Sequence, residues 1–265
     1  MTSKEKVLAY LESNKETFLS GEAIAKELGL SRNSIWKAVN ELRKAGYNIE
    51  AINNKGYRLG TSNDIISAAG ITSYLSESLL NLYSGNDLIR IYDTVNSTNR
   101  LAKEAAIAGA DHGTIIIANQ QTEGRGRKDH NFYSPKGGLY MSLVLKPSNL
   151  STLNPDTITI NTGDSVCDAI YSLLGIRPTL KPINDLFIDD KKICGILTEA
   201  GTEFETGDVQ WIVIGIGINF DSDIASFPSD IKKSATSLFA PGKATFTKNQ
   251  LVAEILTNVI KNICV

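Results

Sequence analysis

The segment 121–142, QTEGRGRKDHNFYSPKGGLYMS, holds the residues best suited to chemistry. Positions 124–128 read Gly-Arg-Gly-Arg-Lys, and an apolar run begins at Leu139. Glycine gives the backbone freedom, and arginine offers a planar fork of donors that fits a carboxylate or a phosphate. The pattern therefore predicts a loop that becomes ordered around an anion. The alternative is a surface loop whose arginines have no ligand.

This loop differs from the common phosphate-binding motifs. A dinucleotide fingerprint needs a third glycine and a following helix, and a Walker loop needs Gly-Lys followed by Ser or Thr. Neither pattern follows Gly126. The chain has two histidines and three separated cysteines, Cys167, Cys194 and Cys264. We therefore expect reduced thiols, with no disulfide framework and no protein-built metal site.

A second polar cluster, Ser97-Thr98-Asn99, begins a predicted helix directly after the apolar run 88–95. Hydroxyls, an amide and the free N–H groups of a first helical turn can hold a small polar ligand. Ser97 can equally serve only as the N-cap of that helix.

A third group lies within predicted strands. Lys192 stands at the head of an apolar strand, where a cation can neutralise charge that develops on a carboxylate or a phosphate. Gly195, Gly215 and Gly217 fall inside strands, where glycine often permits close approach of another group. We expect these glycines to leave room for a flat ligand, although packing explains each of them equally well.

The elements that must hold these residues alternate between strands and helices. Apolar runs predict strands at 88–95, 113–121, 139–147, 177–182, 185–190, 191–200 and 209–220. Helical spacing predicts helices at 71–83, 97–109, 154–175 and 246–264. Hairpins on one sheet with helices on its other face indicate an α+β domain with a mixed sheet.

The first sixty residues are organised differently. Helices are expected at 4–13, 21–29 and 31–46, and Trp36 is expected beside the apolar face of the third. A hairpin with its turn at 53–56 follows. This arrangement resembles a winged helix-turn-helix domain. The alternative is a three-helix bundle that binds protein or covers the rest of the chain.

That resemblance implies a DNA-binding surface, with the third helix in the major groove. The residues expected to contact DNA are Ser31, Arg32, Asn33, Ser34 and Lys37 on this helix, with Lys55 and Arg58 on the wing. Because the phosphate contacts are few, specific binding should need a dimer.

Charge is distributed unevenly along the chain. Residues 1–60 carry ten Lys/Arg and seven Glu, whereas the remaining residues carry 17 Lys/Arg and 22 Asp/Glu. A polar break places the predicted domain boundary near residue 62, which gives domains 1–62 and 63–265. The segment 1–10 has no apolar core of signal-peptide length, and no apolar run of 18 residues occurs, so we expect a cytoplasmic protein without membrane association.

Together these segments resemble the biotin protein ligases, specifically the bifunctional bacterial kind that carries an N-terminal winged helix and represses biotin genes. The resemblance covers nearly all of the chain. The motifs that carry it occur in the family's order: Ser97-Thr98-Asn99, the loop 124–127 with the strand 134–142, Asn184-Asp185 with Lys192 and Gly195, 215–219, and 235–238.

The resemblance assigns roles to individual positions. The residues that it implies bind biotin are Ser97, Thr98, Asn99, Gln121, Gly124, Arg125, Gly126, Arg127, Lys192 and Gly195. The residues that it implies bind the nucleotide are Arg127, Lys181, Asn184, Asp185 and Asn219. The catalytic residues would be Lys192, Arg125 and Arg127, and Mg²⁺ would be held mainly by the phosphates of ATP.

The implied reaction has two steps. The biotin carboxylate attacks the α-phosphate of MgATP to give biotinyl-5′-AMP and pyrophosphate, and a lysine of a biotin carboxyl-carrier protein then displaces AMP. Neither step needs a protein nucleophile, since positioning and charge stabilisation suffice. The resemblance thus implies an ATP-dependent ligase that also represses biotin genes as a homodimer on operator DNA.

Three departures from the family's pattern leave other functions open. His130 and Phe132 stand where the loop often has arginine and tryptophan, and residues 181–185 read KPIND in place of KWPND. The SH3-like domain that usually follows is expected to be absent after Val265. The first alternative is a biotin-sensing repressor with reduced or lost ligase activity, and the second is a ligase for lipoate or octanoate.

Overall fold

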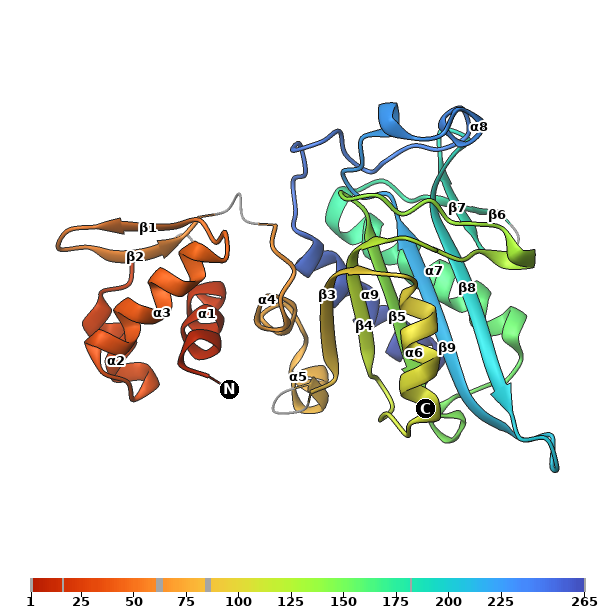
Figure 1. The fold of residues 1–265 in the computed structure, drawn as a ribbon, viewed down its shortest axis with the longest axis horizontal. Coiled ribbons are helices and arrows are strands. Elements are labelled where there is room, and N and C mark those ends of the chain that lie inside the picture. The colour runs from red at the N-terminus through yellow and green to blue at the C-terminus, as the bar shows by residue number, and fades with distance from the viewer. Residues whose placement is uncertain (1, 16, 61–63, 84–86, 182, 265) are drawn as a thin grey trace. The chain divides into compact units, whose positions relative to one another are not determined.

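The structure is a computed structural model that describes residues 2–15, 17–60, 64–83, 87–181 and 183–264 (Figure 1). The chain divides into two compact units. One contains Met1–Leu80 and Thr247–Ala253, and the other contains Asn81–Phe246 and Glu254–Val265. The domain boundary expected near residue 62 lies outside the described residues and stays a prediction.

The N-terminal unit begins with three helices and a hairpin. Their bounds are α1 Ser3–Ser13, α2 Gly21–Leu28, α3 Arg32–Lys44, β1 Ile49–Ile52 and β2 Gly56–Leu59. Each helix starts after a hydroxyl residue whose side chain accepts a hydrogen bond from the first turn: Thr2, Ser20 and Ser31. Gly29 ends α2 in the left-handed region at φ 63°, which glycine adopts without steric cost. The winged helix-turn-helix prediction is therefore confirmed.

The core of this unit is apolar, and the start of β2 approaches the residues just before α2. Leu11, Ile24 and Ile35 are fully buried. Gly56 has φ 101°, and a Cβ added there would lie 2.1 Å from the carbonyl oxygen of Leu19, so no other residue fits.

Trp36 differs from the expectation that it lies beside the apolar face of α3. Its side chain is 56% exposed, whereas Ile35, Val39 and Leu42 fill the core. Trp36 therefore belongs to the outer surface of the helix.

Two short helices follow, α4 Ala68–Thr72 and α5 Glu77–Tyr83. The single helical segment predicted at 71–83 is therefore wrong. Asp64, just before α4, accepts hydrogen bonds from the backbone nitrogen and Nζ of Lys248, both at 2.6 Å. This contact ties the segment before α4 to the first residues of α9, Lys248–Ile263.

The second unit is built on a seven-stranded mixed sheet of order β3-β4-β5-β9-β8-β7-β6. The strands are β3 Ile89–Val95, β4 Ile115–Gln121, β5 Leu139–Leu145, β6 Thr179–Lys181, β7 Asp185–Ile188, β8 Lys191–Thr202 and β9 Val209–Ile218. β3 and β4 are parallel, and every other neighbouring pair is antiparallel. The prediction of an α+β domain with a mixed sheet is confirmed.

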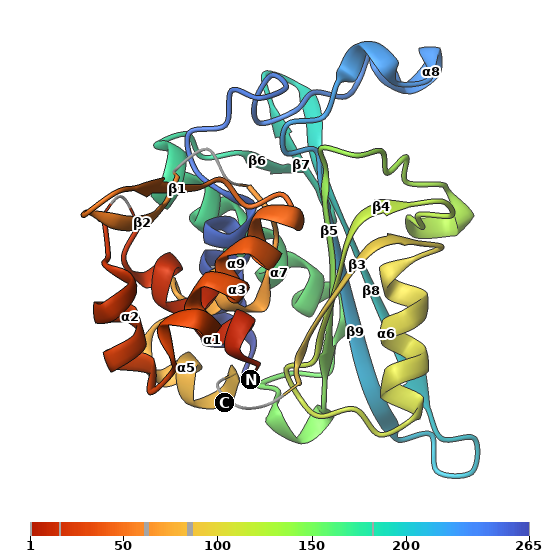
Figure 2. The ribbon, with the colours of Figure 1, turned by 60° about the vertical axis from the view of Figure 1, so that its left-hand side comes forward.

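Helices cover both faces of this sheet. α6, Thr98–Ile107, packs on one face through Ala102, while α7, Pro155–Leu174, lies on the other, beside the C-terminal part of α9 (Figure 2). The short α8, Ser229–Lys232, lies near one end of the sheet. All seven residues of β5 are buried, as expected for a central strand with helices on both faces. Among the described residues, no helix combines the length and apolarity needed to cross a membrane.

Candidate active site

The topology of the second unit brings the ends of several strands together at one end of the sheet. Because β3 and β4 are parallel, their C-terminal residues Val95 and Gln121 lie side by side. The antiparallel neighbours bring the start of β5 beside the end of β9, where Leu139 pairs with Ile218. Cys194 pairs with the same Ile218, which adds the start of β8. Segments far apart in the sequence thus meet at this end of the sheet.

A cavity of about 530 Å³ opens there. Its walls include most of the residues predicted to bind biotin or nucleotide: Ser97, Thr98, Asn99, Gln121, Arg125, Gly126, Arg127, Asn184, Asp185, Lys192 and Gly195. Its volume falls in the range typical of small-molecule sites.

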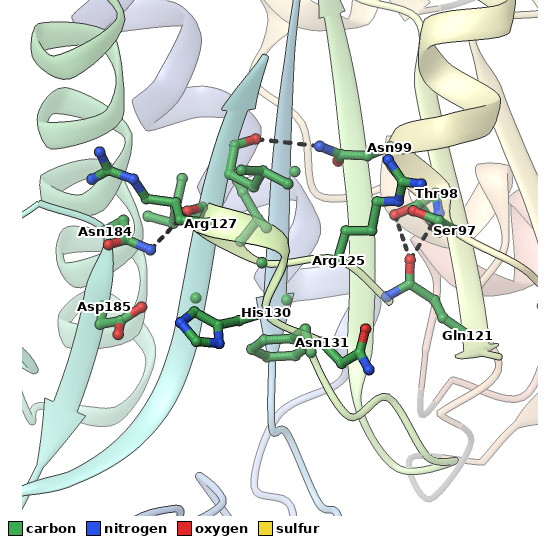
Figure 3. A pocket seen from close by; sticks show the side chains of 18 of the residues that line it. Ser97, Thr98, Asn99, Gln121, Arg125, Arg127, His130, Asn131, Asn184 and Asp185 are labelled. Carbon is green, nitrogen blue, oxygen red and sulfur yellow. Dashed lines mark hydrogen bonds between the residues drawn. The ribbon is translucent and has the colours of Figure 1, made fainter. Parts of the chain in front are cut away.

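The glycine-arginine loop folds back on itself above the cavity. Gly126 donates its backbone N–H to the carbonyl of His130 at 2.7 Å, and Phe132 donates to the carbonyl of Gly124 at 2.8 Å. Lys128 adopts the left-handed conformation at φ 53°. In Figure 3 the side chain of Arg125 extends toward Thr98 and Asn99. The loop thus carries cationic groups to the cavity from a hydrogen-bonded hairpin.

The Ser97-Thr98-Asn99 cluster caps α6 and lines the cavity, while its role in holding a ligand stays a prediction. Ser97 is the N-cap of α6, because its hydroxyl accepts from the backbone nitrogen of Arg100 at 3.5 Å. Gln121 Oε1 accepts from the backbone nitrogen of Thr98 at 2.8 Å and from its hydroxyl at 3.0 Å (Figure 3). Ser142 Oγ donates to Asn99 Oδ1 at 2.6 Å. All three members of the cluster are nearly buried and also line the cavity.

The three strand glycines admit the chain's own side chains. A Cβ added at Gly215 would lie 1.9 Å from Asn99 Oδ1, and one at Gly217 would lie 2.6 Å from the ring of Phe132. At Gly195 the same ring would be 3.0 Å away. In this structure Asn99 and Phe132 lie beside these glycines, and all three glycines also line the cavity, so the expectation that they leave room for a flat ligand stays a prediction.

Lys192 is fixed by both its backbone and its side chain. Its N–H donates to the carbonyl of Ser234 at 2.7 Å, and its carbonyl accepts from Thr236 at 2.9 Å. Its Nζ pairs with the carboxylate of Asp185 at 2.7 Å and lies 5.7 Å from the ring centre of Phe132. Asp185 thus faces the lysine, and the two form a partly exposed ion pair in the cavity wall.

Three predicted ligand residues do not line the cavity. Gly124 is buried under the loop, where an added Cβ would meet the carbonyl oxygen of Phe132 at 2.3 Å. Lys181 pairs with Asp190 at 2.8 Å. Asn219 is buried and donates from Nδ2 to the carbonyl of Thr236 at 3.0 Å. The nucleotide-binding roles of Lys181 and Asn219 stay predictions.

The structure adds residues to the site that the sequence did not indicate. Phe132 covers the glycines, and Ser142 and Glu199 contact Asn99. The strand pairing explains Ser142 and Glu199, because both lie on strands beside β9. Burial raises the pKa of the Cys194 thiol, two residues after Lys192, well above its usual range, which disfavours a thiolate nucleophile there. The described residues contain no group of three or more His, Cys, Asp or Glu side chains that could hold a metal ion.

The predicted DNA-contacting residues lie on α3 and the hairpin of the N-terminal unit. Arg32, Asn33, Lys37 and Lys55 are exposed. The Ser31 hydroxyl caps α3 and lies 2.9 Å from that of Ser34. Arg58 pairs with Glu50 at 2.7 Å and lies over the ring of Phe18, so its charge is partly used within the hairpin.

Two protein families match separate parts of the chain. Residues 3–58 match the family described as "HTH domain", and residues 91–219 match the "Biotin/lipoate A/B protein ligase family". Among solved structures, the fold is similar to that of the biotin protein ligase from Aquifex aeolicus in complex with biotin and ATP. The two have a TM-score of 0.56 and 27% sequence identity over 67% of this chain and 70% of that one.

Similar proteins include the bifunctional ligase/repressor BirA of Bacillus subtilis (strain 168), which is 38% identical over 222 residues. That match covers 83% of this chain and 66% of the relative. BirA of Escherichia coli (strain K12) is 30% identical over 217 residues, covering 81% of this chain and 62% of the relative. The chain therefore spans slightly less than two thirds of the length of these relatives. Through residues 91–219 the chain belongs to the biotin/lipoate A/B protein ligase family, and through residues 3–58 it carries an N-terminal HTH domain.

Proposed function

We propose that the chain is an ATP-dependent biotin protein ligase that also represses biotin genes. One observation carries this proposal: the cavity brings together the arginine loop, the polar start of α6 and Lys192. The names of the similar proteins, which include ligase/repressors and biotin protein ligases, support the same function.

The first step needs a carboxylate held against a phosphate in an environment that absorbs negative charge. Arg125 and Arg127 offer fixed forks of donors, and Lys192 offers a compact cation. The polar groups of Thr98 and Gln121 suit a cyclic urea, which both donates and accepts hydrogen bonds. We assign biotin to this end of the cavity and the α-phosphate of ATP to the end near Lys192. Attack of the biotin carboxylate would form biotinyl-5′-AMP and release pyrophosphate.

In the second step, an acceptor lysine amine of a biotin carboxyl-carrier protein attacks the mixed anhydride, and AMP leaves. A folded loop over the anhydride excludes water and so limits its hydrolysis. Asp185 is a carboxylate of the cavity, but it already faces Lys192. We therefore propose that Mg²⁺ enters mainly with the phosphates of ATP. A cytoplasmic location supplies ATP, carrier and DNA together.

The proposal is tested by incubating the full chain with biotin, MgATP and a biotin carboxyl-carrier domain, and measuring the mass of the carrier. A gain equal to one biotinyl group is expected only when biotin and ATP are both present. If the chain binds biotin but forms neither adenylate nor labelled carrier, the biotin-sensing repressor becomes the better explanation.

If α3 binds DNA, Arg32→Ala should lower the affinity of the chain for DNA. Arg32 is exposed at the start of α3, where recognition helices contact base edges or phosphates. Its removal should weaken binding to DNA from upstream of the biotin genes by roughly five- to a hundredfold, the range for one good contact. Fluorescence anisotropy at several salt concentrations measures the loss. Lys4→Ala, which removes an exposed cation from α1, should change affinity little, and equal losses in both variants would contradict a specific role for Arg32.

We also propose a homodimer, since two-fold symmetry lets two recognition helices contact a palindromic site. β3 forms one edge of the sheet, and its Tyr92 side chain is 40% exposed. An edge strand of this kind can pair with a second copy. Sedimentation velocity with and without biotin and ATP tests this, and a monomer at all concentrations that support DNA binding would contradict it.

A further inference from the structure

Behind the cavity, Asn99 is held by a carboxylate. Asn99 Nδ2 donates to Glu199 Oε2 at 2.8 Å. The other carboxylate oxygen, Oε1, accepts from Lys103 Nζ at 2.8 Å. Lys103 lies one helical turn after Asn99 on α6, and Glu199 lies on β8. The lysine and glutamate side chains are 24% and 25% exposed, so this ion pair is well shielded from solvent.

An ionised carboxylate can only accept hydrogen bonds. The nitrogen of the Asn99 amide must therefore face Glu199, where the carbonyl of Leu197 also accepts from it at 3.4 Å, and its oxygen must face Ser142. An amide oxygen also only accepts, so the single hydroxyl proton of Ser142 is directed to Asn99. Asn99 is 4% exposed and Ser142 is fully buried, which leaves no solvent to replace either contact.

The hydroxyl of Ser142 also contacts Thr98, another residue proposed to bind biotin. Ser142 Oγ also donates to Thr98 Oγ1 at 2.8 Å, because the hydroxyl proton of Thr98 is itself donated to Gln121 Oε1 at 3.0 Å. At the other end of the chain of contacts, Gln121 Nε2 donates to Ser134 Oγ at 2.9 Å. Ser134 donates in turn to the carbonyl of Phe132 at 2.8 Å. The carboxylate of Glu199 thus directs the hydrogen bonds of Asn99 and Ser142, and the carbonyl of Phe132 directs those of Gln121 and Thr98.

We infer that Glu199, paired with Lys103, is a positioning residue that sets which atom of Asn99 donates and which accepts in the biotin site, and that directs the hydroxyl of Ser142 through Asn99. The inference rests on the proposed function and adds a specificity device to it. A cyclic urea has a fixed pattern of two N–H donors and one carbonyl acceptor, so a reversed pattern in the site would oppose it.

Glu199→Gln tests this through a conflict between neighbours. Lys103 can only donate, so it attracts the oxygen of the introduced amide and turns the amide nitrogen toward Asn99. Asn99 must then present its oxygen to that nitrogen, which turns its own nitrogen toward Ser142. We expect the Kd for biotin to rise about ten- to a hundredfold, the range for an opposed buried hydrogen bond.

Removing the lysine as well should relieve the conflict. In Glu199→Gln combined with Lys103→Met, the introduced amide is free to turn its oxygen to Asn99 Nδ2. Biotin binding should then return to within about threefold of wild type, and Lys103→Met alone should lose no more than about threefold, since a surviving hydrogen bond retains most of its effect. A purely structural role for Glu199 would not be rescued by deleting a second side chain. Glu104→Gln, at an exposed position paired with Arg100, is the matched control.

The experiment is isothermal titration of the full chain with biotin alone, beside the thermal unfolding midpoint of each variant. A loss in Glu199→Gln that is recovered in the double variant supports the inference. Equal affinity in wild type and Glu199→Gln, or an unrecovered loss in a folded double variant, overturns it. If Glu199→Gln does not fold, the double variant still decides, because it must bind biotin nearly as wild type does. A wild-type chain that binds no biotin overturns the proposed function itself.

Discussion

Lys192→Ala should lower the rate of biotinyl-AMP formation by about a hundred- to a thousandfold, the usual effect of removing one preorganised charge stabiliser. Lys192 Nζ faces the cavity from the start of β8 and lies 2.7 Å from Asp185. Its removal takes away a cation and leaves the carboxylate of Asp185 unpaired in the cavity wall. Both effects raise the energy of a transition state in which a carboxylate approaches a phosphate.

The measurement is a rapid-quench single turnover at saturating biotin and ATP, which reports the adenylation step without the carrier. Lys191→Ala is the matched control, because Lys191 is the exposed neighbour on the same strand and does not line the cavity. The control should adenylate at the wild-type rate. A Lys192→Ala variant that adenylates as fast as this control would remove Lys192 from the chemistry.

Gly215→Ala should abolish tight biotin binding, with a loss of at least about a hundredfold, and should also destabilise the fold by roughly 1–3 kcal/mol through overpacking. The added methyl group would lie 1.9 Å from Asn99 Oδ1. Asn99 cannot yield without breaking its hydrogen bonds to Ser142 and Glu199. The substitution therefore displaces the residue at the centre of the polar site.

Biotin titration and urea unfolding measure the two effects separately. Gly21→Ala is the control for the type of substitution, because its nearest new contact would be an ordinary 3.5 Å from the ring of Tyr57. Wild-type affinity in a folded Gly215→Ala variant would show that biotin binding does not depend on the position of Asn99.

The local elements were predictable because their patterns are strong. The long helix α7 has an Asn154 cap, a proline in its first turn and Gly175 at its end, and it was expected at 154–175. The strands β4, β5 and β9 each contain a run of apolar residues, so their positions were expected to within a few residues. The prediction of a single helix at 71–83 was wrong. The apolar residues of this segment fit one helix, whereas the chain bends between α4 and α5.

The prediction for Trp36 was wrong for a different reason. An aromatic residue beside apolar helix positions suggests a core, but α3 turns this side chain outward. Helical spacing gives a period, and at the margin of the apolar face it cannot distinguish a buried position from an exposed one.

The site was predictable in its composition but only partly in its contacts. The motifs named most of the residues that line the cavity. The partnership of Asn99 with Glu199 joins residues 100 positions apart. It depends on the packing of α6 against the sheet, which local patterns do not report. The same holds for Phe132, whose ring fills the space beside Gly195 and Gly217 only because the loop folds back over them.

The most direct test of the central claim is ATP–pyrophosphate exchange catalysed by the full chain with biotin, lipoate or octanoate as the acid. Exchange reports the reversible formation of the acyl adenylate and needs neither carrier nor DNA. We predict exchange with biotin, and little with lipoate or octanoate, because neither acid carries the cyclic urea that Thr98 and Gln121 are proposed to bind. Exchange with lipoate or octanoate and none with biotin would contradict the proposed function.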